Sequence, residues 1–321
     1  MASGIGRVAR VAMTLGLATA GLAQEPVDPL AQAAGAAAPG SKTCKWVSKT
    51  ELSCEPGAVP DEKTVAAGVA EAKASVRQAD YAAAAQILRQ IVGDSTEDAA
   101  LLALYGEVLV AAGDARGAVP ILERAIAAAP GAPRLHFQLA TAHTTLGNVD
   151  QALEAYAAEI EANEEPKVRF LAHLNRSILL TSAGRNAEAA ASLELALALE
   201  PTEHPEAYGD LATLYLNAGD PAKASEALER GGKVGFRSAR LYFNIGARLY
   251  NDKNYAEAER AFTRALEIDP NMAQAERSLA SALTHLGRSA DARPHLARYL
   301  ELRPDAPDAD QVRQLLAASG D

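Results

Sequence analysis

The stretch from Ala239 to Met272, which reads ARLYFNIGARLYNDKNYAEAERAFTRALEIDPNM, determines how the rest of the chain is interpreted. The polar turn residue Asn254 lies near its centre, and Asp269-Pro270 lies near its end. Proline has no backbone N–H and ends a helix cleanly. The stretch therefore predicts a unit of 34 residues in which two helices are joined by a turn.

The same pattern recurs along the chain at an almost constant spacing. The repeats are separated by 34, 34, 37, 35, 34 and 34 residues and begin at Val65, Ala99, Pro133, Phe170, Pro205, Ala239 and Ala273. The twentieth residue of each repeat is alanine: Ala84, Ala118, Ala152, Ala189, Ala224, Ala258 and Ala292. The eighth residue is always small: Ala72, Gly106, Ala140, Ser177, Ala212, Gly246 and Ala280. Antiparallel helices pack closely only where the facing side chains are minimal, so these positions predict the contact within each helix pair.

Larger residues and helix-ending residues complete the pattern. The twenty-fourth residue is large and mostly apolar: Leu88, Leu122, Tyr156, Leu193, Leu228, Phe262 and Leu296. Glycines such as Gly113 and Gly219, which suit the left-handed conformation after a helix, stand between the two halves of a unit. Position thirty-two is proline in four repeats: Pro130, Pro201, Pro270 and Pro304. We therefore expect an all-α fold made of helix pairs.

This pattern resembles that of the tetratricopeptide repeat family, which has small residues at positions eight and twenty and proline at position thirty-two. The resemblance covers residues 65–306 and implies a right-handed α-solenoid of about seven repeats, with a capping helix and tail in 307–321. The family's tryptophan at position four is missing from every repeat, and the first repeat is weak, as a terminal capping unit is. We expect Gly231-Gly232 to end the second helix of the fifth repeat early, and 163–167 to form a longer connection.

Composition and charge exclude some classes of partner. The chain is 49% hydrophobic and 5% aromatic, and it carries a formal net charge of −10. A protein that follows a nucleic-acid backbone needs a basic stripe, and the sequence has no such cluster. An anionic membrane surface is disfavoured for the same reason. We therefore expect no nucleic-acid partner and no stable membrane insertion.

The first 23 residues have the features of a secretory signal peptide. Arg7 and Arg10 precede an apolar run, and Gly21-Leu22-Ala23 provides small residues at a cleavage site. A mitochondrial presequence is the alternative, and Ala18-Thr19-Ala20 is a second possible cut. We expect cleavage after Ala23 and a periplasmic or secreted protein. Residues 24–43 are rich in Ala, Gly and Pro and are expected to form a flexible linker.

Two cysteines bound a short segment ahead of the repeats. Cys44 and Cys54 enclose the only tryptophan, Trp46, and residues 44–54 suggest a short hairpin. An even number of cysteines in an exported chain favours a structural disulfide, with free thiols or thiol chemistry as alternatives. We expect this ring to lie outside the repeats and to affect stability only locally.

The sequence offers no catalytic or metal-binding constellation. His136 and His143 are seven residues apart and are able to share a helix face, but no third ligand stands at metal spacing. Packed or half-exposed histidines are the simpler interpretation. Gly231 to Gly235 lacks the strand and the G-K-[ST] ending of a phosphate loop. We therefore expect no enzyme activity, no catalytic residue, no metal and no cofactor.

The family resemblance implies a concave groove, lined by the first helices, that binds a peptide or a folded protein. The residues implied for this partner-binding groove are Arg134, Phe137, Gln138, Thr141, Asn175, Asn217, Arg240, Phe243, Asn244, Tyr250, Asn251 and Arg277. Asn175 and Asn244 hold position six, where peptide-binding members use asparagine to bond a ligand's main chain. The expected function is a non-enzymatic scaffold or adaptor in envelope assembly, secretion or maturation machinery. A self-associating homo-oligomeric array, or an accessory subunit of a metal-dependent or catalytic complex, is the alternative.

Overall fold

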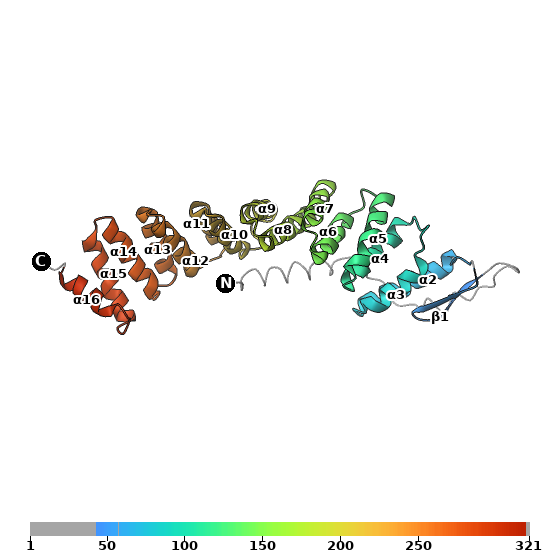
Figure 1. Ribbon diagram of the computed structural model, residues 1–321, viewed down its shortest axis with the longest axis horizontal. Helices are drawn as coiled ribbons and strands as arrows, with labels where there is room; N and C mark the ends of the chain where they lie inside the picture. The colour runs from blue at the N-terminus through green and yellow to red at the C-terminus, as the bar shows by residue number, and fades with distance from the viewer. Residues whose placement is uncertain (1–42, 57, 319–321) are drawn as a thin grey trace. The chain divides into compact units, whose positions relative to one another are not determined.

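The computed structural model describes residues 43–56 and 58–318, which form helices and one small β-hairpin (Figure 1). The expected signal peptide at 1–23 lies outside the described residues, as does nearly all of the expected linker at 24–43. The chain divides into two compact units at Leu179/Leu180, which we describe separately. The all-α fold class expected from the sequence is confirmed. No described helix has both the length and the apolar character needed to cross a membrane.

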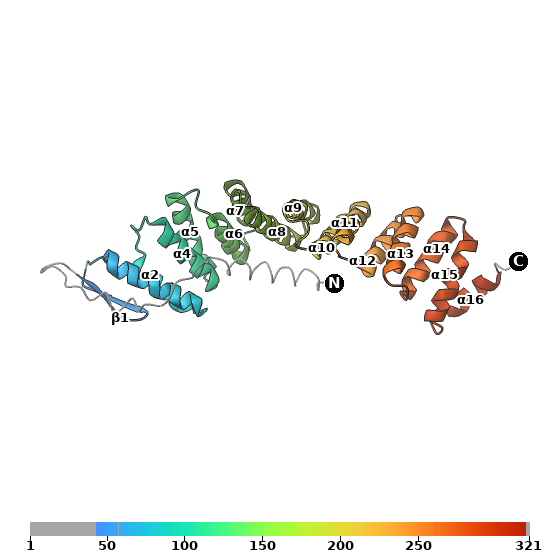
Figure 2. The same ribbon diagram turned by 180° about the vertical axis from the view of Figure 1, so that it is seen from behind.

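The N-terminal unit begins with the hairpin and continues as consecutive helix pairs (Figure 2). Its elements are β1 (Cys44–Ser48), β2 (Glu51–Cys54), α2 (Glu62–Arg77), α3 (Tyr81–Ile91), α4 (Ala99–Ala111), α5 (Ala115–Ala128), α6 (Leu135–Leu146), α7 (Val149–Ala162) and α8 (Pro166–Ser182), within which the boundary falls. The C-terminal unit follows with α9 (Asn186–Leu199), α10 (Ala207–Ala218), α11 (Pro221–Lys233), α12 (Ala239–Asn251), α13 (Tyr255–Ile268), α14 (Ala273–His285), α15 (Ser289–Leu302) and α16 (Ala309–Ala318).

The small residues of the repeat pattern are the contact points of the helix pairs. All seven alanines at position twenty are buried, with exposed fractions of 0% to 2%. The glycines at position eight receive the large side chain of position twenty-four. A Cβ atom at Gly106 would lie 2.4 Å from Cδ2 of Leu122, and one at Gly246 would lie 2.6 Å from Cδ1 of Phe262. The pattern at positions eight, twenty and twenty-four is therefore explained by close packing within each pair.

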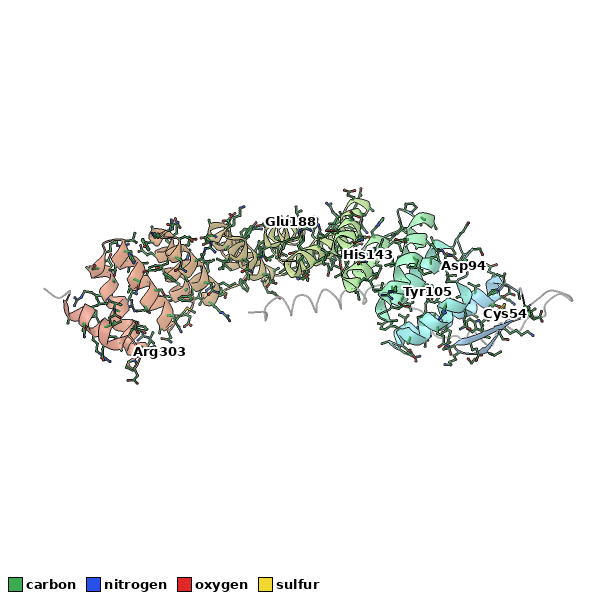
Figure 3. The ribbon with its side chains drawn as sticks, in the orientation of Figure 1. Cys54, Asp94, Tyr105, His143, Glu188 and Arg303 are labelled. Atoms are coloured by element: carbon green, nitrogen blue, oxygen red, sulfur yellow. A yellow bond between two sulfur atoms is a disulfide. The ribbon has the colours of Figure 1, made fainter. Side chains whose placement is uncertain are left out.

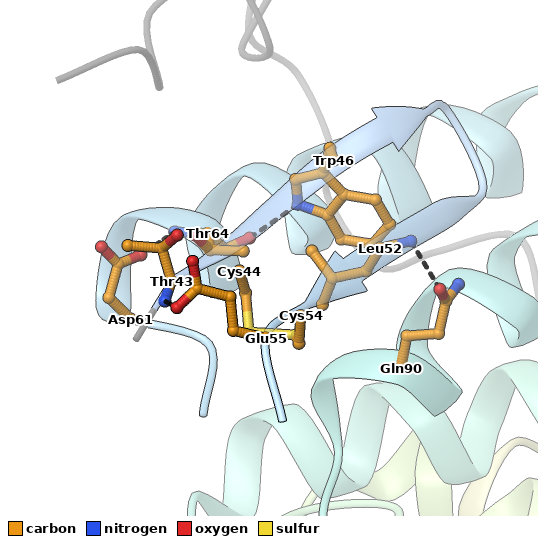
Figure 4. Close-up of a disulfide and its surroundings, with 9 residues drawn as sticks. All are labelled: Thr43, Cys44, Trp46, Leu52, Cys54, Glu55, Asp61, Thr64 and Gln90. Carbon is orange, nitrogen blue, oxygen red and sulfur yellow. Dashed lines mark hydrogen bonds between the residues drawn. A yellow bond between two sulfur atoms is a disulfide. The ribbon is translucent and has the colours of Figure 1, made fainter. Parts of the chain in front are cut away.

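The cysteine-bounded segment is an antiparallel hairpin closed by a disulfide between Cys44 and Cys54 (Figure 4). The expectation that this ring lies apart from the repeats is wrong. The indole N–H of Trp46 donates to the carbonyl of Thr64 at 3.0 Å, and Trp46 and Leu52 pack against the core of the first repeats. The Gln90 side chain on α3 accepts from the backbone N–H of Leu52 and donates to the carbonyl of Thr50, both at 2.6 Å.

Because α2 has no preceding helix pair among the described residues, its apolar surface needs another cover. The Trp46 ring supplies that cover at Gly68, where an added Cβ would lie 2.6 Å from Trp46 Cζ2. The docked tryptophan thus leaves no room for a side chain at Gly68, which holds position four of the first repeat. The hairpin is the N-terminal cap of this unit.

Two expectations about helix ends are also wrong. The helix α11 runs through Gly231 and Gly232 and ends at Lys233. Glycine is needed at position 231 because this residue is buried against Tyr208, and a side chain there would collide with it. The residues 163–167 do not form a long loop, because α8 begins at Pro166 and takes up the extra residues in a longer first helix. Proline suits this place because the first N–H groups of a helix have no partner within it.

Candidate partner-binding surface

In the C-terminal unit the first helix α10 contacts α12, and α12 contacts α14; α10 and α12 both carry polar side chains at groove positions of the repeat. Of these, Asn217, Arg240, Asn244 and Asn251 are exposed and Asp210 is half-buried. We call these five residues the open polar face. The side chains of these five residues make no hydrogen bond or ion pair with another described residue. They hold positions two, six and thirteen of the repeat, which the family resemblance places in the groove.

The second helices of the same unit differ in that most of their charges are already paired. Arg230 on α11 donates two hydrogen bonds to the Glu194 carboxylate on α9, at 2.7 and 2.8 Å. Arg288, which precedes α15, pairs with Glu259 on α13 at 2.8 Å. Exposed ion pairs such as these contribute little to stability, but they occupy the groups that a partner would otherwise bind. Apart from the exposed Glu226 and Glu229 on α11, most charged groups of these second helices are therefore less available to a partner than the side chains of the open polar face.

Aromatic side chains lie beside the open polar face. Phe243 is half-buried, and its ring centroid is 5.7 Å from that of Phe262. Tyr250 makes edge contacts with Tyr255 and His285, whose own rings are stacked at 4.4 Å. Phe243 and Tyr250 were expected as groove residues; each is partly committed to packing and keeps part of its surface exposed.

Asp210 is the one acidic member of the open polar face. Its partial burial, together with the charge of Glu206 one helical turn away, raises the pKa of this carboxyl to about 6. Burial is the larger cause of the raised pKa, because it removes water from the charged form, and the like charge of Glu206 adds to the effect. The carboxylate has no compensating donor among the described side chains. An unpaired, half-buried carboxylate is able to accept hydrogen bonds from a group outside the described chain.

In the N-terminal unit, the expected groove residues are mostly used by the fold itself. Phe137 and Gln138 are both 8% exposed, and the Phe137 ring lies edge-on against Tyr156 at 5.7 Å. The Thr141 hydroxyl donates to the carbonyl of Phe137. Arg134 is half-buried and stands at the start of α6. Phe137 and Gln138 therefore do not offer a binding surface, which corrects the expectation for this repeat.

The start of α6 is held by a carboxylate that the sequence did not point out. Glu159 on α7 is 1% exposed and accepts from the backbone N–H groups of Arg134 and Phe137, each at 3.0 Å. A helix leaves its first N–H groups without internal partners, so Glu159 acts as a cap supplied by the neighbouring helix. A glutamate among many surface acids carries no sequence signal of this role.

Asn175, the second asparagine at position six, differs from Asn244. Its amide donates to the carbonyl of Leu171 at 2.8 Å, within α8. Nearby, burial and the charges of Arg169 and Arg176 lower the pKa of His173. One donor of the Asn175 amide is thus already engaged, whereas the Asn244 amide is free. The sequence predicts the same role for Asn175 and Asn244, whereas the structure shows that the two amides differ in hydrogen bonding.

Arg277, also expected in the groove, belongs to the C-terminal end of the chain. Its guanidinium donates to Asp308 at 3.0 Å and to the Ser281 hydroxyl at 2.9 Å. The Tyr299 hydroxyl donates to the other oxygen of Asp308 at 2.5 Å, and these two partners lower the pKa of Asp308. Asp308 immediately precedes α16, so this cluster attaches the last helix to α14 and α15. Arg277 is committed to that attachment.

Two hollows lie away from the open polar face. One, of about 380 Å³, is lined by α13, α14 and α15 and includes Glu259, Glu276 and His295, and the other, of about 450 Å³, includes Arg124 beside the loop 94–97. The polar groups of both are largely paired. Glu276 bonds His295 at 2.6 Å, and Arg124 donates to three carbonyls of that loop and its flank.

No group of three His, Cys, Asp or Glu side chains in the described part of the chain is arranged to hold a metal ion. His143, labelled on α6 in Figure 3, lies 3.3 Å from the Asn148 amide. His136 is half-buried on the same helix. These two histidines are accommodated by the packing of the third repeat.

The geometry of the helix pairs agrees with sequence comparison. Models of the tetratricopeptide repeat match residues 69–133, 109–172, 180–247 and 245–317. The chain belongs to the tetratricopeptide repeat family. No curated protein sequence matches the chain.

Three solved structures illustrate the likeness in fold. A structure of Naa15/Naa10 bound to HypK-THB is 15% identical, with 79% of this chain and 38% of that chain covered and a TM-score of 0.57. YrrB, described as a tetratricopeptide repeat protein with an unusual peptide-binding site, is 19% identical, with 60% and 97% covered and a TM-score of 0.41. MamA is 21% identical, with 55% and 93% covered and a TM-score of 0.40.

Proposed function

We propose that this protein is a non-enzymatic scaffold that holds a protein or peptide segment on the open polar face of α10 and α12. The observation that carries the proposal is the set of free polar side chains on these first helices, next to second helices whose charges are mostly paired with one another. Membership of the tetratricopeptide repeat family supports it, since the first helices of that family line the surface that binds peptides.

The chemistry of the face suits an extended main chain. The Asn217, Asn244 and Asn251 amides each present donors and an acceptor, so each is able to bond a peptide N–H and a peptide carbonyl. Phe243 and Tyr250 add partly exposed rings, which supply contact area at low entropic cost. Main-chain recognition by amides next to aromatic rings is the binding mode that this arrangement supports best.

We also propose that the protein is exported and works in envelope assembly, secretion or maturation machinery. The disulfide between Cys44 and Cys54 supports an oxidising compartment, because such bonds persist outside the reducing cytosol. Intact-mass measurement of the protein from periplasmic or secreted fractions tests the export. A chain that begins at Gln24 and retains the disulfide is the expected result, and full-length reduced chain in the cytosol contradicts it.

Site-specific photocrosslinking tests the binding surface. A photoreactive amino acid replaces Asn244 in one variant and Gln314, an exposed amide on α16, in the control. Adducts with another protein are expected from position 244 and not from position 314. Adducts only with a second copy of the chain would support the self-associating array instead, and equal adducts from both positions would contradict recognition on this face.

Amide truncation gives the energetic counterpart of that experiment. Asn244→Ala together with Asn251→Ala is expected to weaken capture of the crosslinked partner by about 0.5–1.5 kcal/mol for each lost hydrogen bond. Gln311→Ala with Gln314→Ala, a matched pair of exposed amides on α16, is expected to leave it unchanged. The fold is preserved in both cases because none of the four amides has a partner within the described residues.

A further inference from the structure

The electrostatic imbalance of α10 distinguishes it from the other first helices of its unit. Glu206 and Asp210 lie one turn apart on the same side of the helix, and their charges oppose one another. On α14, by contrast, Arg277 pairs with Asp308 and Glu276 pairs with His295. On α10 the Asp210 carboxylate pairs with no cation of the described residues.

The helices packed against α10 do not supply the missing charge. On α9 and α11, Glu194 and Arg230 pair with each other. Lys223 on α11 pairs with Asp220, and on α12 Arg248 pairs with Asp252. Glu188 on α9 pairs with Arg185. Glu226, Glu229 and Lys233 on α11 and Arg240 on α12 form no ion pair with the Asp210 carboxylate. Glu206 is the charged group that, together with burial, raises the pKa of Asp210.

We propose that the segment held on the open polar face presents a basic side chain, whose ammonium or guanidinium group pairs with the carboxylate of Asp210. This inference rests on the proposed function and names the chemistry of its partner. Charge complementarity carries it, because a half-buried carboxylate without a donor gains more from an incoming cation than from any other group. Neighbouring Glu206 reinforces the preference for a cation and disfavours an acidic side chain.

The other amides of the open polar face indicate how the basic residue is placed within the segment. Asn217 lies seven residues further along α10, about two turns away on the same side of the helix, and Asn244 holds the equivalent position six on α12. A main chain bonded by these amides passes Asp210 with a side chain directed at its carboxylate. The specificity is therefore for one basic residue within an extended segment, and not for a generally cationic protein.

Selection from a library of random twelve-residue peptides, displayed on phage, tests this proposal with the purified protein. Wild type, Asp210→Asn and the control Glu257→Gln, which changes an acid on the second helix α13, are used in parallel. Wild type and the control are expected to enrich peptides with a Lys or Arg at a recurring place, and Asp210→Asn is expected to lose that enrichment. Selected peptides, made synthetically, are expected to bind Asp210→Asn about tenfold or more weakly, as for loss of a charge-assisted bond.

The outcomes separate this inference from the function on which it rests. Peptides that lose binding on Asn244→Ala but keep it on Asp210→Asn, with no basic preference, would leave the proposed function standing and overturn the inference. A library that yields no binder to wild type counts against both. Self-association of wild type that Asp210→Asn abolishes, measured by sedimentation, would mean that a second copy supplies the cation, and it would overturn recognition of a separate partner.

The pH dependence of peptide binding provides a readout that a merely structural role would not change. The pKa of Asp210 is raised to about 6, so the carboxyl becomes protonated as the pH falls through that value. The affinity of wild type for a selected basic peptide is expected to fall about tenfold between about pH 7.5 and pH 5, because only the ionised form pairs with a cation. The affinity of Asp210→Asn is expected to stay flat, and a parallel fall in both would overturn the assignment to Asp210. The isosteric amide preserves the fold, which circular dichroism verifies.

Discussion

Two adjacent glycines in α11 allow a test of close packing in which the same change has opposite effects. Gly231 and Gly232 both lie within the helix, and neither has a positive φ. A Cβ atom at Gly231 would lie 2.8 Å from Cβ of Tyr208, whereas a Cβ atom at Gly232 would meet nothing within 4 Å. The change to alanine is chemically identical at the two positions, so any difference comes from the space around them.

The magnitudes follow from helix propensity and from overpacking. Alanine in place of glycine stabilises a helix by about 0.5–1 kcal/mol, which is the expected gain for Gly232→Ala. At Gly231 the new Cβ and the Tyr208 Cβ are both fixed to backbones, so only a separation of α10 and α11 relieves the contact. Such overpacking costs about 1–3 kcal/mol. Gly231→Ala is therefore expected to be destabilising by up to about 2 kcal/mol.

Tyr208 has little freedom to yield. It is 3% exposed, its hydroxyl donates to the carbonyl of Pro201 at 2.9 Å, and the Arg230 guanidinium lies 5.3 Å above its ring. Urea unfolding followed by circular dichroism measures both variants against wild type. If Gly231→Ala stabilises the protein as much as Gly232→Ala does, then Gly231 is not required by packing and this account of α11 is wrong.

Four further changes test other parts of the structure. Cys54→Ser is expected to lower the free energy of unfolding by about 2–3 kcal/mol, because the opened hairpin also loosens the docked Trp46, and unchanged fluorescence of this single tryptophan would contradict the cap. Glu159→Gln is expected to cost about 1–3 kcal/mol in urea unfolding, since one of two backbone N–H groups loses its acceptor, and a neutral result would show that the cap is not needed. Ala224→Leu is expected to cost about 1–3 kcal/mol through overpacking, and a stability equal to that of wild type would mean that the repeat register is wrong. Asp210→Asn is expected to stabilise the protein by about 1–2 kcal/mol at neutral pH, because the pKa of Asp210 is higher in the folded than in the unfolded state and its ionised form therefore destabilises the fold. The gain should disappear below about pH 4, where the carboxyl is protonated in both states.

The sequence was sufficient for the fold because the helix pair is a local structure that repeats. Small residues at positions eight and twenty are needed wherever two helices of a pair touch, so the same constraint appears seven times in the printed chain. The burial of Ala84 and Ala258, both 0% exposed, follows from that requirement alone. Repetition turns a weak local preference into a pattern that needs no tertiary information.

The binding surface was less predictable, because a groove position states which way a residue points and not what lies next to it. Phe137 and Asn244 occupy neighbouring groove positions of different repeats, yet one is buried against Tyr156 and the other is free. Position five of the third repeat faces a neighbouring helix that carries a large ring. Phe243, at position five of the sixth repeat, also meets a ring, that of Phe262 at 5.7 Å, yet it stays half-buried; the exposure of an aromatic side chain at this position thus depends on the other neighbours that the fold places around it.

The sequence by itself determined the helix pairs, their register and the positions of close contact, because these depend on residues within one repeat. Only the tertiary structure decided which polar groups remain free, as with Asp210, and which are used internally, as with Glu159 and Arg277. It also decided that the disulfide-closed hairpin is a cap, since Gln90 bonds the backbone of Thr50 and Leu52 across about 40 residues of chain and Trp46 packs on the core of the first repeats. Pairing of this kind is a property of neighbours in space, and a one-dimensional pattern does not contain it.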